Sequence, residues 1–190
     1  MKYLNRELRG TKGYINKQRL FELIKTLVMF AMALGIFFIG LFTLGTKKSL
    51  WSVFAVLALL PACRALVGFI MFARFSSLSD DEYRRYDKRC ENLPVIYENI
   101  LTTSDRTFFV PVICAVGGNV LALYLKDKDE DHALRDHINA VCKTAGHDVT
   151  VKIFDDETAF FTRIDGARAN LTVKEGKDNA AIDAIRSVSL

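Results

Sequence analysis

Two long apolar segments dominate the first half of the chain. Residues 26–45 form a run of twenty residues without a charge, and residues 50–72 form a second run whose one charged residue is Arg64. A helix rises about 1.5 Å per residue, so each run is long enough to cross the roughly 30 Å hydrocarbon core of a bilayer. Because only residues 46–49 separate the runs, the pattern predicts an antiparallel transmembrane hairpin within residues 26–74.

Small residues within the first run predict where its helix packs. Ala31 and Gly35 lie four residues apart, a spacing that places both on one side of a helix. Small residues on one side allow a second membrane helix to approach closely. Gly40 follows further along the same run. We therefore expect this face to pack against the second helix of the same chain, with packing against another copy as the alternative.

After residue 79 the long runs give way to short elements of both helical and strand type. Ser79 and Glu82 have the spacing of a capping box, and Gly117–Gly118 is typical of a two-residue hairpin turn. Pro111 interrupts one strand pattern and predicts a local defect in pairing. The expected elements are a helix at 80–92, strands at 95–102, 107–116 and 120–126, a helix at 127–145, a strand at 149–153, and helices at 156–169 and 178–188.

This order, α-β-β-β-α-β-α-α, predicts an α/β (α+β) fold with a mixed four-stranded sheet in residues 79–190. About 110 residues are enough to close a small hydrophobic core. We therefore divide the chain into a basic segment at 1–25, a helical hairpin at 26–74 and a folded domain at 79–190.

Lysine and arginine are concentrated on the outer flanks of the hairpin. Residues 1–25 hold seven basic and two acidic side chains, whereas the connection between the runs holds only Lys47 and Lys48. Basic flanks favour the cytoplasmic side, so both termini and the folded domain are expected in the cytoplasm. The sequence thus predicts a multi-pass protein of the plasma or inner membrane. The residues expected at the membrane interface are Trp51, Arg74, Arg84 and Arg85.

Arg64 is unusual because it lies ten residues before Arg74, which is about 15 Å along a helix. A charged side chain at such a depth costs about 2.5 kcal/mol or more. One interpretation is that Arg64 pairs with a carboxylate of another subunit or protein, or lines a wet cavity. The other is that a bend at Pro61 allows it to reach a lipid phosphate.

The net charge of +4 hides a contrast between regions. The basic excess lies before residue 79, while residues 79–190 hold fifteen basic and twenty acidic side chains. An acidic domain does not present a broad phosphate-binding face, so no nucleic-acid partner is expected. The charges of the helix at 80–92 alternate in sign, which favours a solvated face over a site for anionic lipids.

No motif for catalysis or metal binding is present. The four cysteines form no CxxC pair and are expected to be reduced. His132 and His137 are five residues apart, so they do not share a helix face as zinc ligands do. We expect no catalytic residues, no metal and no cofactor.

The order of elements resembles the core of the restriction-endonuclease-like superfamily. That resemblance implies an acidic residue at the second strand and an acidic-x-Lys motif on the third. Asp105 and Asp127 are weak acidic candidates, and Lys126 ends the third strand. Tyr124 stands where the motif has its acid. The resemblance therefore implies a degenerate nuclease-like core, and a membrane-tethered enzyme is an alternative function.

Taken together, these patterns favour a two-span membrane protein that presents a small α/β domain for partner binding, scaffolding or regulation. The expected partners are the lipid bilayer and either a protein or further copies of the chain, contacted through the spans. A subunit of an oligomeric channel or transporter that uses Arg64 is a second alternative.

Overall fold

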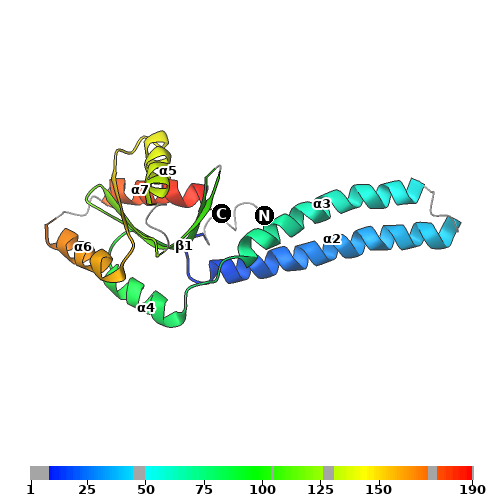
Figure 1. The fold of residues 1–190 in the computed structure, drawn as a ribbon, viewed down its shortest axis with the longest axis horizontal. Helices are drawn as coiled ribbons and strands as arrows, with labels where there is room; N and C mark the ends of the chain where they lie inside the picture. The colour runs from blue at the N-terminus through cyan, green and yellow to red at the C-terminus, as the bar shows by residue number, and fades with distance from the viewer. Residues whose placement is uncertain (1–8, 45–49, 104, 126–130, 171–174, 190) are drawn as a thin grey trace. The chain divides into compact units, whose positions relative to one another are not determined.

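The computed structural model describes residues 9–44, 50–103, 105–125, 131–170 and 175–189. Figure 1 shows the chain from the N-terminal helix to the C-terminal helix. The chain divides into two compact units: one is Ile15–Ser76, and the other combines Met1–Tyr14 with Ser77–Leu190. The hairpin is therefore an insertion between two parts of one folded domain.

The first unit consists of two antiparallel helices, α2 (Tyr14–Leu44) and α3 (Leu50–Ala73) (Figure 1). Both are long and apolar enough to cross a membrane, and in each only 17% of the most apolar window is buried. Helices in the core of a soluble protein are mostly buried, so these two differ from core helices. Helix α2 also starts twelve residues before the apolar run that we used to predict it.

Small side chains form the contact between the two helices. Thr26, Ala33 and Gly40 are buried on α2, seven residues apart, and Ala62 and Ala65 are buried on α3. A seven-residue repeat of this kind is the seam of two helices that cross at a small angle. The predicted packing between the helices is thus present. Of the small residues that predicted it, Gly40 is buried in the seam, whereas Ala31 is exposed and Gly35 is only half-buried.

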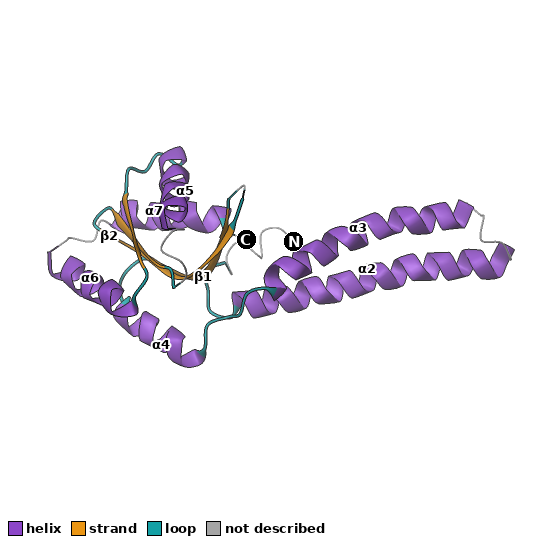
Figure 2. Ribbon diagram, viewed as in Figure 1, coloured by secondary structure: helices purple, strands orange, loops and turns teal. Residues whose placement is uncertain are grey.

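The second unit is built on a four-stranded mixed sheet in the order β1-β2-β3-β4 (Figure 2). Neighbouring strands pair antiparallel, except that β3 and β4 are parallel and are joined by a helical crossover. The strands are β1 (Val95–Thr102), β2 (Thr107–Val116), β3 (Asn119–Leu123) and β4 (Thr150–Phe154). The predicted mixed sheet and the order of all elements in this unit are confirmed.

Helices cover both faces of this sheet (Figure 2). One face packs against α5 (Asp131–Thr144) and α7 (Glu175–Val188), and the other against α4 (Asp80–Arg89) and α6 (Glu157–Asn170). A sheet that is buried on both faces explains why the strand sequences are almost continuously apolar.

Local signals in the sequence set several of these boundaries. Ser79 and Glu82 form the predicted capping box at the start of α4. Gly117 and Gly118 both have positive φ, as the predicted hairpin turn requires. Helix α4 ends at Arg89, earlier than predicted, because the backbone leaves helical geometry at Cys90, where ψ is 8°, and Asn92 has a φ of +63°.

The predicted defect at Pro111 is present and extends into the neighbouring strand. Tyr97 pairs with Val112 and Asn99 pairs with Val110, so Glu98 lies opposite Pro111 without a ladder pair. Proline has no N–H to donate, and Glu98 adopts a φ of +52°. Because of this irregularity, Ile96 and Leu101 pack on the same face of the sheet although they are five residues apart in β1. It also gives the Glu98 side chain an unusual direction for a strand residue.

Candidate functional site

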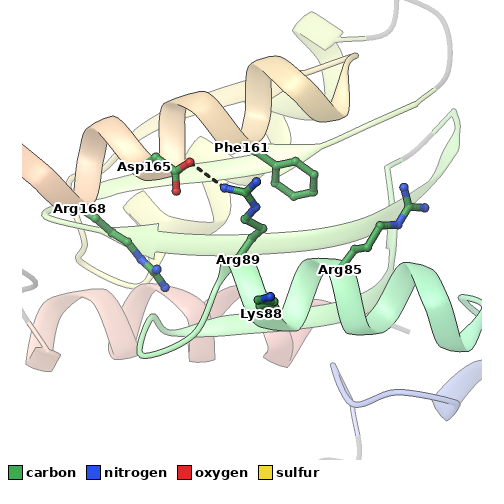
Figure 3. Close-up of a pocket in the computed structure, with 6 residues that line it drawn as sticks. All are labelled: Arg85, Lys88, Arg89, Phe161, Asp165 and Arg168. Carbon is green, nitrogen blue, oxygen red and sulfur yellow. Dashed lines mark hydrogen bonds and ion pairs between the residues drawn. The ribbon is translucent and has the colours of Figure 1, made fainter.

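A basic pocket lies between α4 and α6, on one side of the sheet. Its volume is about 460 Å³. The lining comprises three basic residues of α4 and three residues of α6: Arg85, Lys88, Arg89, Phe161, Asp165 and Arg168 (Figure 3). On α4 the basic residues are spaced i, i+3 and i+4, which places them on one helix face. We call this feature the α4–α6 pocket.

Glu157 at the start of α6 holds the two helices together. Its carboxylate accepts a hydrogen bond of 2.7 Å from Tyr86 Oη and an ion-pair contact of 3.2 Å from Arg85 Nη1. The Tyr86 ring is buried beneath α6. Burial, and then the hydrogen bond to Glu157, raise the pKa of Tyr86 well above its ordinary value, so this phenol stays protonated as a donor.

Arg89 lies at the centre of the pocket, between Asp165 and Phe161 (Figure 3). Its Nη1 is 2.9 Å from Asp165 Oδ2, and its guanidinium lies 5.4 Å from the centroid of the Phe161 ring. Arg168 extends from α6 and donates a hydrogen bond to the carbonyl of Glu91. These contacts orient the guanidinium groups without neutralising the pocket.

Four cations against one lining carboxylate make this pocket positive within a domain whose net charge is negative. Lys88 forms no hydrogen bond or ion pair within the part of the chain that the structure describes. The ion pairs of Arg85 and Arg89 are solvent-exposed, and such pairs contribute only about 0–1 kcal/mol. An anionic ligand can therefore displace the carboxylates from these two arginines with little loss of free energy. The lining provides charge and shape for binding, but no nucleophile with an adjacent base.

A second cluster surrounds the buried carboxylate of Glu98, which is 1% exposed. Glu98 Oε1 accepts hydrogen bonds from the backbone N–H of Gly13 at 3.0 Å, from the N–H of Leu78 at 3.1 Å and from the hydroxyl of Ser77. Gly13 immediately precedes α2, and Ser77 follows α3. One carboxylate thus binds both segments of the domain from which the hairpin leaves.

Residues 9–13, which we call the N-terminal strap, lie along the edge strand β1. The carbonyl of Gly10 accepts a 2.9 Å hydrogen bond from the N–H of Tyr97. At Gly10 a Cβ atom would come within 2.8 Å of the Ile96 side chain, and φ is +77°, so only glycine fits. Lys12 forms a 2.6 Å ion pair with Asp80, and its hydrogen bond and charge lower the pKa of this carboxyl group.

Most of the site residues predicted from the sequence do not come together. Arg64 and Arg84 are exposed on their helices, Arg74 is exposed just after the end of α3, and Asp105 is exposed in the β1–β2 turn. Arg85 is the one predicted interface residue that lines the α4–α6 pocket. Asp127 and the side chain of Trp51 lie outside the described residues, as does Lys126. Among the described residues no group of three potential metal ligands is present.

Sequence reasoning missed both clusters to different degrees. Glu98 could have been recognised from the sequence, because it is an acidic residue within an apolar strand. A charged residue in a buried strand needs specific hydrogen-bond partners. The pocket carried no such signal. Arg168 is 79 residues from Arg89 in the chain, and only the packing of α6 beside α4 brings the two into one cavity.

Comparisons with known proteins gave no match: no family model, no curated protein and no solved structure is detectably similar to this chain. The function must therefore be argued from the geometry above.

Proposed function

We propose that this protein is a two-span membrane protein that presents the α/β domain as a binding module, with the α4–α6 pocket as its binding surface. The observation that carries the proposal is the insertion of two exposed apolar helices between two parts of one domain. In water, such helices would expose large apolar side chains along most of their length, and a bilayer removes this cost.

The insertion also supports the proposed topology. The N-terminal strap and residues 77–78 are bound by the same carboxylate, so the two flanks of the hairpin must lie on one side of any membrane. A chain whose flanks are on the same side crosses the membrane an even number of times. The positive flanks favour the cytoplasm as that side, in the plasma or inner membrane.

Arg64 fits this proposal as a point of contact with other molecules. It is exposed on α3, among side chains that would face lipid, and no acidic residue pairs with it among the described residues. A lone cation in this position favours a partner chain, a further copy of this chain or a lipid phosphate.

The test combines membrane extraction with reporter fusions to the full chain. We expect the protein to stay in the membrane fraction after alkaline carbonate washing. A reporter active only in the cytoplasm should work at either terminus and fail when inserted within residues 45–49, and an exported reporter should show the reverse. Release by carbonate, or opposite locations for the two termini, would contradict the proposal.

A further inference from the structure

We infer that the α4–α6 pocket binds a compact phosphate-bearing group. The inference rests on the proposed function for the position of the pocket near a membrane, and it adds the chemical class of the ligand. It depends on four basic side chains from two helices that line one cavity.

The donors in this pocket match the oxygen atoms of a phosphate group. Guanidinium groups offer paired N–H donors that bind two phosphate oxygens at once, while an ammonium group acts as a point charge. Arg89 and Arg168 come from opposite helices, and Lys88 contributes a cation without a protein partner among the described residues. A cavity of about 460 Å³ falls in the range of small-molecule sites, so it suits a head group better than an extended chain.

Phe161 and Asp165 limit which anions fit. The Phe161 ring fixes the guanidinium of Arg89 at a centroid distance of 5.4 Å, and Asp165 holds it from the other side. Asp165 is half-exposed, so its ion pair can open when a stronger anion enters. A divalent phosphate is favoured over a single carboxylate, because it can interact with several cations at once.

The chain connection indicates the main source of such a group. The six residues between the end of α3 at Ala73 and the start of α4 at Asp80 span at most about 25 Å when fully extended. If α3 crosses a membrane as proposed, the start of α4 is therefore tethered within about 25 Å of that end of α3. Anionic head groups are concentrated there and attract basic side chains by about 1 kcal/mol each. A soluble phosphate compound is the other source of the same chemistry.

The test uses the full chain in lipid nanodiscs and two charge-matched double variants. The pocket variant combines Lys88→Gln with Arg168→Gln. The control variant combines Arg84→Gln on α4 with Arg163→Gln on α6, which are exposed residues outside the pocket lining. Both variants lose two positive charges from the same two helices, so any general electrostatic effect is equal.

Two probes distinguish the sources. Inorganic pyrophosphate is titrated by calorimetry into protein held in phosphatidylcholine discs. The midpoint of thermal unfolding of the domain is then compared between these discs and discs that also contain phosphatidic acid. Losing two charged hydrogen-bond donors should weaken binding at least about tenfold in the pocket variant and less than about twofold in the control.

A selective loss of pyrophosphate binding, or a selective loss of the stabilisation by phosphatidic acid, supports the inference and identifies the source. Equal behaviour of the two variants with both probes overturns it. So does the absence of any binding by the unmodified protein. These results leave membrane extraction and terminus location unchanged, so failure of the inference is distinguishable from failure of the proposed function.

Discussion

The hairpin and the α/β domain bury opposite kinds of side chain. In the domain the fully buried side chains include Phe108, Tyr124 and Leu134, while charged residues cover the outside. In the hairpin the buried positions are held mainly by small residues, and large residues such as Phe42, 84% exposed, point outward. One chain thus follows two packing rules.

The difference agrees with the two solvents, water and a bilayer, that the proposed function assigns to the two units. A core in water is stabilised by removing large apolar surfaces from the solvent. In a bilayer that gain disappears, and helices associate through close approach at small residues. Truncating a large apolar side chain should therefore destabilise the α/β domain strongly and the hairpin very little.

The largest expected effect is the removal of a core ring. Phe108→Ala should destabilise the domain by about 3–5 kcal/mol, because this fully buried ring packs edge-on against Tyr124. Chemical denaturation of the full chain in detergent measures the loss. Phe42→Ala is the matched control, and we expect almost no change there; a comparable loss at Phe42 would show that the hairpin is packed like a soluble core.

The next effect concerns the carboxylate that joins the two flanks of the hairpin. Glu98→Ala should cost about 2–3 kcal/mol, because it leaves the buried N–H groups of Gly13 and Leu78 without an acceptor. Glu98→Gln keeps one acceptor oxygen and should cost less. Hydrogen exchange should accelerate at the amides of Gly13 and Leu78 before it does in β1, and unchanged protection at these two amides would contradict the assignment.

Enlarging the seam of the hairpin should have a smaller effect. Ala33→Leu places a large side chain where α2 and α3 touch, and we expect a cost of about 1–3 kcal/mol. Ala31→Leu adds the same volume at an exposed position of the same helix and should be tolerated. The two variants can be compared by unfolding in increasing concentrations of dodecyl sulfate, and equal resistance would argue against the seam.

The smallest expected effect is a dependence of the domain on pH. Burial lowers the pKa of His137 on α5 below its ordinary value. The folded state therefore disfavours the charged imidazole, so its contribution to stability is complete above the ordinary pKa and is lost as the pH falls through the folded pKa. Thermal unfolding at pH 7.5 and 5.5 should differ less in His137→Gln than in the unmodified chain; an equal or larger difference would exclude His137 as the cause.

Much of the fold could be predicted because its signals are local. The capping box at Ser79 and the hairpin turn at Gly117–Gly118 depend on a few neighbouring residues, and the structure contains both. The start of α2 could not be predicted from hydropathy, because its first turns are polar and bury Gln18 at a helical spacing from Ile15. Hydropathy marks where a helix can meet lipid and does not mark where the helix begins.

The candidate site was much less predictable. Arg85 was singled out for its place near the end of the second apolar run, but its role in a cavity depends on α6, whose position only tertiary packing determines. The alternating charges along the helix at 80–92 predict a solvated face. One face of this helix nevertheless carries three cations, because charges that alternate in sign along the sequence do not alternate around the helix.

The N-terminal strap also fixes an order of events during synthesis. Gly13 leaves the ribosome long before its partner Glu98, which lies 85 residues further along the chain. The domain can close only after both apolar helices have been made, so in the proposed membrane the hairpin inserts first. A hairpin inserted with its flanks on opposite sides would leave the strap unable to reach β1. The unfinished domain would then be open to proteases, and closure of the domain thus acts as a check on correct insertion.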